Sequence, residues 1–374
     1  MLKVMTVVGT RPELIRLSRV IARLDEIAQH VLVHTGQNHD YSLNQIFFDD
    51  LEIRKPDHLL GVDTSSLGRV LGEILIRTEQ VLIKERPDAV LVLGDTNSCF
   101  AAVMAKRLRI PVYHMEAGNR CFDENVPEET NRRLVDHVAD FNLVYTEHAR
   151  RNLLAEGLHP RRIMLTGSPM REVLDHYRPQ IDASDVLPRL GLAPRSYVVA
   201  SSHREETVDH PQRLGLLLAS LRAVRDRWQV SVIVSTHPRT RQRLESLAAD
   251  DLERIRFHEP FGFLDYVRLQ MNALCTLSDS GTISEESAIL GFPAVTLRDS
   301  IERPESLDAG SIVMSGVEPA GVLEAMATLV DGGADRRPFS MAAEYTIADC
   351  SRRVIRFIVS TARRHSLWAG LNRP

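Results

Sequence analysis

Two acidic residues stand directly after neighbouring apolar segments of the chain. Asp95 follows the run 89–93, and Glu116 follows the run 110–113 after His114 and Met115. Both runs have the composition of buried strands in a parallel sheet, and ligands bind at the carboxyl edge of such sheets. Taken alone, Asp95 is explained equally well as a helix N-cap. Two acids on consecutive strands favour a site, because a carboxylate partly removed from water needs a partner or a task.

A third acid lies in the first turn of a helix that begins at Pro127. Glu128 and Glu129 occupy this turn, where the helix dipole favours carboxylates. Helix capping and solvated charge account for Glu129. We assign Glu128 to the same site as Asp95 and Glu116.

The N-terminal segment has the pattern of a phosphate-binding turn. An apolar run at 4–8 leads into Gly9-Thr10-Arg11-Pro12 and then into a helix. Strand, glycine turn and helix bring backbone N–H groups to a phosphate, with Arg11 and Arg16 nearby. Arg16 is explained equally well as a surface residue of an amphipathic helix. The glycine fingerprints of nicotinamide enzymes and P-loop proteins do not occur in the sequence.

A second anion-binding pattern lies in the other half of the chain. The turn Ser-Gly-Thr at 280–282 precedes a helix and leaves N–H donors and the positive end of the dipole for an anion. Glu286, about one turn further on, can take a pair of sugar hydroxyls. The charged segment 298–305 is either a surface salt-bridge network or part of the site, and its place after an apolar strand favours the site.

Strands and helices alternate along both halves of the chain, which is typical of doubly wound α/β domains. Three prolines interrupt the periodicity between 171 and 194, and we interpret that segment as a linker. A last amphipathic helix at about 350–367 can cross back onto the first domain. The sequence therefore predicts two Rossmann-like domains, 1–170 and 171–349, facing one another across a deep cleft.

Composition excludes several classes of protein. The net charge of -4 argues against a general nucleic-acid binder. The four cysteines are widely spaced without a Cys-x-x-Cys pair, as expected for free thiols in a reducing compartment. Because no apolar run approaches membrane-spanning length and the N-terminal run is too short for a signal peptide, we expect a cytoplasmic protein with no membrane partner.

The residues alone favour a nucleotide sugar as the ligand. Acids beside a phosphate would oppose its binding, so the carboxylates should face a neutral part of the ligand. A diphosphate would lie on the helix N-terminus and the arginines, with the sugar against the carboxylates. No Asp-x-Asp pair or His/Cys cluster suggests a metal, and we expect no cofactor.

Seven motifs, in order over essentially the whole chain, closely resemble those of the non-hydrolysing UDP-N-acetylglucosamine 2-epimerases. They are Gly9-Thr10-Arg11-Pro12-Glu13, Gly94-Asp95-Thr96, His114-Met115-Glu116-Ala117-Gly118, Pro127-Glu128-Glu129-x-Asn131-Arg132, His203-Arg204-Glu205, Asp279-Ser280-Gly281 and Glu302-Arg303-Pro304-Glu305. The resemblance implies a GT-B fold, a homodimer, and inversion of C2 in a UDP-2-acetamido sugar. In that family, UDP is eliminated across C1–C2 to give a 2-acetamidoglycal and is then added back with the proton on the opposite face, without metal or redox cofactor.

The resemblance also assigns residues. The matching catalytic positions are Asp95, Glu116, Glu128 and His203. Substrate and UDP binding are expected at Arg11, Arg16, Arg132, His237, Phe261, Ser280, Gly281, Thr282, Glu286 and Arg303. The chemistry needs more than one acid, because one group removes the C2 proton and another must supply a proton to the opposite face.

Departures from the family pattern bear on the substrate. Arg16 replaces the usual lysine, and the family's Ser-Gly-Gly-Ile-Gln-Glu-Glu reads Ser-Gly-Thr-Ile-Ser-Glu-Glu at 280–286. The family's Ala-Gln-His segment helps to bind an activating second UDP-sugar in some members. Here that segment reads Gly-Gln-Asn-His at 36–39. With the segment 118–123, these variants are more similar to the branch that converts UDP-2-acetamido-2,6-dideoxy-L-talose to UDP-N-acetyl-L-fucosamine for capsule or O-antigen synthesis. The alternatives are UDP-GlcNAc/UDP-ManNAc epimerisation, a GT-B glycosyltransferase and a non-catalytic nucleotide-sugar sensor.

Overall fold

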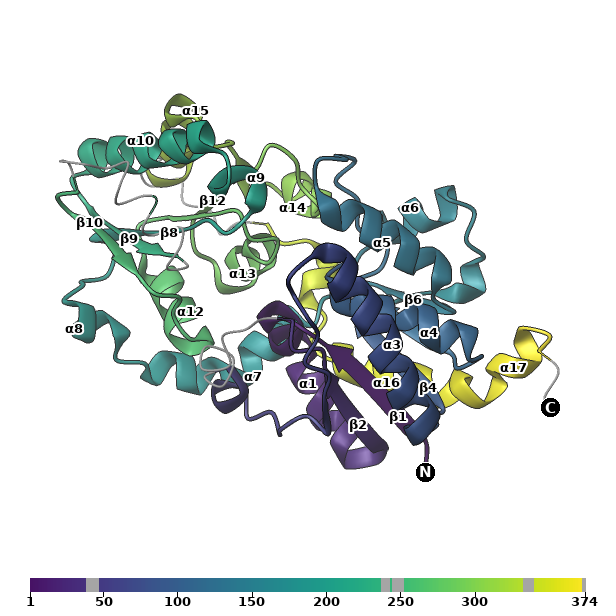
Figure 1. The fold of residues 1–374 in the computed structure, drawn as a ribbon. Helices are drawn as coiled ribbons and strands as arrows, with labels where there is room; N and C mark the ends of the chain where they lie inside the picture. Colours follow the sequence, from purple (N-terminus) through teal and green to yellow (C-terminus); the bar gives the residue numbers. More distant parts are fainter. Residues whose placement is uncertain (38–46, 237–242, 244–251, 332–339, 372–374) are drawn as a thin grey trace. The chain divides into compact units, whose positions relative to one another are not determined.

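The chain folds into two α/β units, each built on a parallel sheet (Figure 1). The computed structural model describes residues 1–37, 47–236, 243, 252–331 and 340–371. Unit 1 comprises Met1–His176 and Ile347–Pro374, and unit 2 comprises Tyr177–Thr346. Each unit is described below by itself.

Unit 1 contains a seven-stranded sheet with the strand order β3-β2-β1-β4-β5-β6-β7. Its strands are β1 (Lys3–Val8), β2 (Gln29–His34), β3 (His58–Leu59), β4 (Ala89–Leu93), β5 (Val112–Met115), β6 (Phe141–Val144) and β7 (Ile163–Leu165). The central strands are buried on both faces, because β4 and β5 consist entirely of buried residues. The order reverses beside β1, from which β2 and β4 extend in opposite directions, and such a switch point is where ligands bind in open sheets.

Helices cover both faces of this sheet. They are α1 (Arg11–Ile27), α3 (Leu67–Glu85), η1 (Asn97–Phe100), α4 (Ala101–Arg107), α5 (Pro127–Val138), α6 (Glu147–Ala155) and η2 (Pro160–Arg162). Pro12 and Pro127 stand in the first turns of α1 and α5, where a missing N–H costs no helical hydrogen bond.

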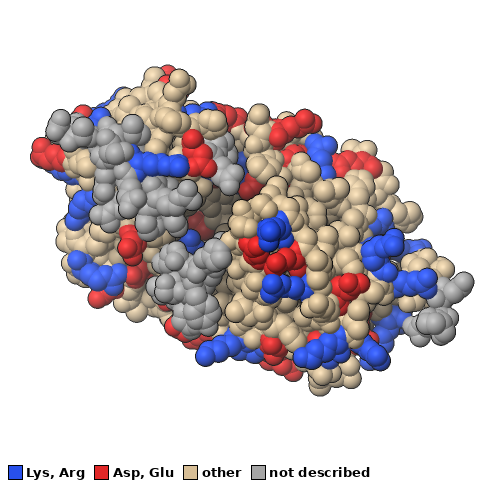
Figure 2. All heavy atoms as spheres, in the orientation of Figure 1, with Lys and Arg blue, Asp and Glu red and all other residues tan. Residues whose placement is uncertain are grey.

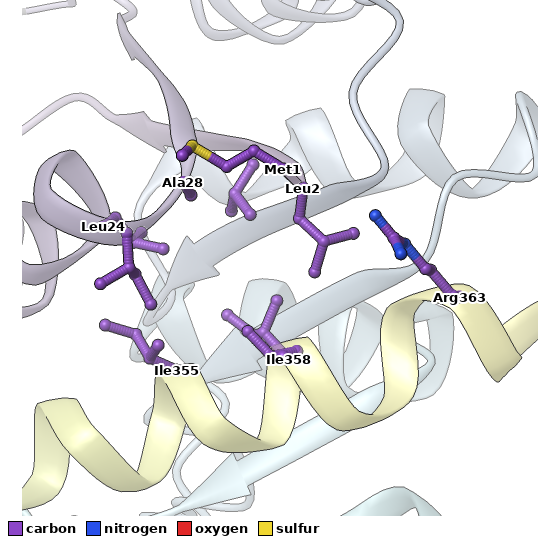
Figure 3. A pocket seen from close by; sticks show the side chains of 10 residues that line it. Met1, Leu2, Leu24, Ala28, Ile355, Ile358 and Arg363 are labelled. Atoms are coloured by element: carbon purple, nitrogen blue, oxygen red, sulfur yellow. The ribbon is translucent and has the colours of Figure 1, made fainter.

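The end of the chain belongs to unit 1. Helix α16 (Cys350–Thr361) packs against α1 and is followed by η4 (Ala362–Arg364) and α17 (His365–Trp368). Figure 3 shows Ile355 and Ile358 of α16 opposite Leu2 and Leu24, around a shallow pocket of about 200 Å³. The apolar stripe of α16 thus completes the core over the N-terminal strand and helix.

Helix α7 (Met170–Ala183) carries the chain from unit 1 into unit 2, and α8 (Val186–Leu190) follows. The segment 171–194, which the prolines predicted to be a linker, is therefore largely helical. Met170, Val173, Leu174, Tyr177 and Ile181 are buried at helical spacing, and this packing outweighs the interruption at Pro179.

Unit 2 contains a six-stranded parallel sheet with the order β10-β9-β8-β11-β12-β13. Its strands are β8 (Tyr197–Ser201), β9 (Ser231–Ser235), β10 (Ile255–His258), β11 (Thr276–Ser278), β12 (Ala294–Thr296) and β13 (Val313–Met314). The remaining helices are α9 (Glu205–Val208), α10 (Pro211–Trp228), α12 (Phe263–Asn272), α13 (Ile283–Leu290), α14 (Pro304–Asp308), α15 (Pro319–Val330) and η3 (Ala343–Thr346). An extended apolar cluster lies between β8, β9, β11, α10 and α15.

Across the part of the chain that the structure describes, no helix is long and apolar enough to cross a bilayer. Basic and acidic side chains are interspersed over most of the face shown in Figure 2. The four cysteines are buried free thiols.

Candidate functional site

The pairing of β4 with β5 places the two predicted acidic loops side by side. Leu93 lies opposite Met115 in the parallel register, and the Gly94 amide donates to the Met115 carbonyl at 3.0 Å. Asp95 and Glu116 are the next polar residues after these strands. They therefore extend from adjacent positions at the carboxyl edge of the sheet, as the sequence predicted.

Glu116 is held against α1 by an arginine. Arg16 Nη1 donates to Glu116 Oε2, and both side chains are almost completely buried. Arg16 is therefore not a surface residue of an amphipathic helix. Glu116 also has a φ of +65°, in the left-handed region that non-glycine residues rarely occupy. A strained backbone at a site candidate indicates that the surrounding contacts fix its side chain.

Asp95 is paired with an arginine of α5. Arg132 donates to Asp95 Oδ2 from Nη2 at 2.6 Å and from Nε at 3.1 Å, and the Asn131 amide donates to the Asp95 carbonyl at 2.8 Å. The N-cap of the following 3-10 helix is Thr96, so capping does not explain Asp95. The side chain of Asp95 stays 20% exposed and can meet a ligand.

Glu129 is not the solvated residue that the sequence analysis assumed. It is buried, and it accepts hydrogen bonds from Arg132 Nη1 at 2.6 Å and from the Cys121 amide at 3.1 Å. Burial alone would raise the pKa of Glu129, but these donors outweigh burial and lower it. Glu129 thus orients Arg132, while its neighbour Glu128 is only half-buried.

A second buried carboxylate, Asp136 of α5, organises the loop after β5. It accepts from the Gly118 amide at 3.1 Å and from Arg120 Nη1 at 2.7 Å, and Arg120 Nη2 donates to Glu156 at 2.7 Å. Asp136 is fully buried. The sequence analysis missed it, because its helical position carries no motif of its own.

Glu13 joins the first loop of the sheet to the Asp95 loop. It accepts from the Gly9 amide at 3.1 Å, Thr10 Oγ1 at 2.7 Å and Thr96 Oγ1 at 3.1 Å, and also from Ser98 Oγ. Burial raises the pKa of Glu13 in spite of these donors. The predicted phosphate-binding turn at 9–12 is thereby fixed to the Asp95 loop, and the Arg11 guanidinium lies 5.4 Å from the centre of the Phe47 ring.

In unit 2, Asp279 holds the loop that follows β8. Its carboxylate accepts from Ser202 Oγ at 2.8 Å, from the His203 amide at 2.9 Å and from the Arg204 amide at 3.0 Å. Asp279 is buried, whereas His203 is exposed. The backbone of His203 is thus fixed, while the residue remains exposed and can meet a ligand.

The predicted anion cradle lies at the start of α13. Ser280 Oγ lies 3.0 Å from Thr282 Oγ1, and the residues 280–282 remain partly exposed. Gly281 faces Glu302, because a Cβ there would lie 3.4 Å from Glu302 Oε2. Glu286 is buried and accepts from Gln270 Nε2 at 2.9 Å.

The charged segment 298–305 is not a surface network. Arg298, Glu302, Arg303 and Glu305 are all buried. Arg303 Nε lies 3.4 Å from Glu285 Oε2, so Arg303 lies beside α13. The structure thereby brings Gly281, Glu286 and Arg303 into one region of unit 2.

The described ring contact of the predicted residue Phe261 is with another part of unit 2. The Phe261 ring centre lies 5.4 Å from that of His258, and no contact joins Phe261 to the cradle among the described interactions. His237 lies outside the described residues.

Comparison with known proteins agrees with this arrangement. A family model described as UDP-N-acetylglucosamine 2-epimerase matches residues 22–359. A solved structure of UDP-N-acetylglucosamine 2-epimerase from Rickettsia bellii is 48% identical, with a TM-score of 0.93 over 98% of this chain and 99% of that one.

Two further proteins are similar over nearly their whole lengths. The Methanocaldococcus jannaschii UDP-GlcNAc 2-epimerase in complex with UDP-GlcNAc and UDP is 32% identical, with a TM-score of 0.86 over 96% of this chain and 99% of that one. A UDP-2,3-diacetamido-2,3-dideoxy-D-glucuronate 2-epimerase from Pseudomonas aeruginosa is 34% identical over 333 residues, 87% of this chain and 92% of that one. The two α/β units, with their acidic loops and anion cradle, thus belong to a member of the UDP-N-acetylglucosamine 2-epimerase family, an isomerase with a GT-B-like fold.

Proposed function

We propose that this enzyme inverts C2 of UDP-2-acetamido-2,6-dideoxy-L-talose to give UDP-N-acetyl-L-fucosamine. The observation that carries C2 inversion is the pair of acidic loops on adjacent strands of unit 1, in which Asp95 and Glu116 are each bonded to an arginine. An enzyme that uses a single general base, such as a glycosyltransferase, would need only one such loop. Two carboxylates allow a proton to leave from one face of C2 and arrive at the other.

In the proposed mechanism the C1–O bond breaks first and UDP leaves with the bonding electron pair. Positive charge then develops at C1, which makes the C2 hydrogen acidic enough for a carboxylate to remove it as a proton, giving the 2-acetamidoglycal. Addition of UDP to C1 and of a proton to the opposite face of C2 completes the inversion. We assign the proton transfers to Asp95, Glu116 and Glu128, and we place His203 with the departing UDP.

Unit 2 supplies the proposed diphosphate site. In the turn at 280–282 the Ser280 amide donates to Ser278 Oγ at 3.1 Å and the Thr282 amide to Ser280 Oγ at 3.4 Å, so the Gly281 amide is the proposed backbone donor. The buried guanidinium of Arg303 lies beside α13, which follows this turn. These groups can balance the charge that UDP gains on leaving. Glu286, held by Gln270, is placed to accept hydrogen bonds from a pair of sugar hydroxyls.

The 6-deoxy-L-sugar is favoured by the sequence variants rather than by the fold. Arg16 now has a defined place against Glu116, and Thr282 occupies the N-cap position of α13, so two of the variants lie within the proposed site. UDP-GlcNAc is the second candidate, because similar proteins carry that substrate in their names. We further propose a cytoplasmic homodimer that acts in capsule or O-antigen synthesis.

The deciding experiment is deuterium incorporation at C2. Purified enzyme is incubated with each UDP-sugar in D₂O, without acceptor or cofactor, and the C2 proton is followed by NMR. We expect exchange and epimer formation with the 6-deoxy-L-sugar. We also expect Asp95→Asn and Glu116→Gln to lose most of both, whereas Asp88→Asn, at the exposed opposite end of β4, keeps them.

The alternatives give different results. Exchange with UDP-GlcNAc alone would replace the proposed substrate and leave the mechanism standing. Transfer of the sugar to an added acceptor without exchange at C2 would show a glycosyltransferase. Binding of a UDP-sugar without either reaction would show a sensor, and both outcomes would reject the epimerase proposal.

A further inference from the structure

We propose that His114 is a positioning residue of the epimerase, a buried imidazole that ties the Asp95 loop to the Glu116 loop. The inference rests on the proposed function, because it gains meaning only if those two acids transfer protons. It goes beyond that function by assigning a task to a side chain that is too deeply buried to touch substrate.

The ring of His114 joins three elements. His114 lies in β5 and has no exposed surface. Its Nε2 lies 2.8 Å from the carbonyl oxygen of Gly94, the residue before Asp95. Its Nδ1 lies 3.0 Å from Oδ1 of Asp136 in α5. One side chain therefore links the end of β4, the end of β5 and the helix that carries Arg132.

One ring nitrogen must carry a proton in this arrangement. A carbonyl oxygen only accepts, so Nε2 donates to Gly94. The carboxylate of Asp136 accepts from Arg120 Nη1 at 2.7 Å and from the Gly118 amide at 3.1 Å. Nδ1 of His114 lies beside this carboxylate without a hydrogen bond to it.

The carboxylate beside His114 is paired with an arginine. Arg120 donates to Asp136 from Nη1 and to Glu156 from Nε and Nη2, each at 2.7 Å. Burial of a charge is costly unless it is paired and hydrogen-bonded, and Arg120 meets both conditions for Asp136. Asp136 is thus a fixed neighbour for the His114 ring.

This cluster also holds the strained turn at Glu116. A left-handed residue costs of the order of 1–3 kcal/mol and persists only where its surroundings fix it. Asp136 fixes the Gly118 amide two residues after Glu116, and Arg120 donates to the Asn119 carbonyl at 2.7 Å. His114 fixes the same turn from the strand side, and it is the member that extends the network to the Asp95 loop.

Kinetics of two variants test the inference. His114→Gln keeps an amide donor for the Gly94 carbonyl but removes the ring, and Asp136→Asn removes the neighbouring carboxylate while keeping its shape. Misplacement of reacting groups by about 1 Å can cost about 100-fold in rate, so we expect kcat to fall about 10- to 100-fold. KM should change less than about threefold, because His114 lies too deep to bind substrate. His137→Gln, at the half-exposed neighbour of Asp136, is the control and should be active.

Spectroscopy of the unmodified enzyme gives a second, independent readout. In protein with ¹⁵N-labelled histidine at pH 7.5, we expect the His114 ring to carry a proton on Nε2 that exchanges slowly with water, because Nε2 donates to the Gly94 carbonyl. A merely apolar role would not require that proton. The measurement stands even if His114→Gln fails to fold, and a His114 ring without a proton on Nε2 would overturn the inference.

The kinetic outcomes separate this inference from the proposed function. If Asp95→Asn and Glu116→Gln keep full exchange at C2, the proposed function has failed. If those variants lose exchange while His114→Gln keeps kcat, only the positioning role is refuted. A parallel loss in kcat for His114→Gln and Asp136→Asn, with KM unchanged, is the result that we expect.

Discussion

Acidification should destabilise unit 1 through His34, the last residue of β2. The side chain is 4% exposed, and burial lowers the pKa of His34 to about 4 from the usual 6.5. The geometry agrees, because the Gly36 amide donates to His34 Nδ1 at 3.0 Å and this nitrogen must therefore be unprotonated. The loop that leaves the sheet at Gly36 thus depends on a neutral His34.

The sign and size of the effect follow from proton linkage. Below pH 6.5 the unfolded chain binds a proton at His34 that the folded chain does not bind until about pH 4, so stability is complete above pH 6.5 and falls as the pH drops. At pH 5 the loss from this residue is about 2 kcal/mol, and below pH 4 it approaches about 3.4 kcal/mol, since each unit of pKa is worth about 1.36 kcal/mol.

The assay compares His34→Gln with the parent protein, because an amide oxygen can still accept from Gly36 but does not titrate. The chain has two tryptophans, and a Trp228→Phe background leaves Trp368 of unit 1 as the fluorescent reporter. Urea unfolding at pH 7.5 and pH 5 should show the variant gaining about 2 kcal/mol relative to the parent at the lower pH. The variant and the parent share all other titrating groups, so the contributions of those groups cancel in the difference between the two proteins. A stability difference that stays constant between the two pH values would refute the assignment.

Two further changes test the loops of unit 1. Arg132→Lys keeps the charge but cannot hold Asp95 through two nitrogens, so kcat for C2 epimerisation should fall about tenfold or more. The control Arg133→Lys, at a half-exposed residue, should stay active. Equal activity of both variants would show that the pairing of Arg132 with Asp95 does not matter. Gly118→Ala should destabilise the protein by more than about 2 kcal/mol, because a Cβ would lie 2.4 Å from a carbonyl oxygen of α6 and the backbone has a strained φ of +79°. The control Gly157→Ala has a φ of +87° but open space around it, so it measures the backbone strain alone. Equal melting temperatures of the two variants in calorimetry would contradict the steric argument.

The strands and the acids at their ends were predictable because they depend on local pattern. The apolar runs at 89–93 and 110–113 have few alternatives to a buried strand, and parallel register then places Asp95 and Glu116 together. Helix α7 was not recognised, although Val173, Tyr177 and Ile181 lie on one buried stripe. The prolines were interpreted as breaks in spite of the helical periodicity, but packing of this buried stripe stabilises the helix.

The supporting carboxylates could not be found in the same way. Glu129, Asp136 and Asp279 have the polar character of ordinary surface residues, and nothing in the local sequence shows that each is buried. Asp136 and Asp279 bind other elements or distant loops, as in the separation of 76 positions between Asp279 and His203. Such contacts depend on the assembled sheet, so the local pattern does not show that these carboxylates are buried.

The two units share one way of fixing a functional loop. Asp136 in unit 1 and Asp279 in unit 2 are buried, and each accepts backbone N–H groups from a neighbouring loop that carries a proposed catalytic residue. The loop conformation is therefore set by carboxylates that do not face the ligand. Residues that are proposed to face it, such as Thr282, can then differ without loss of the loop geometry. That separation gives a physical reason why a protein 34% identical to this one can be an epimerase of a diacetamido-glucuronate.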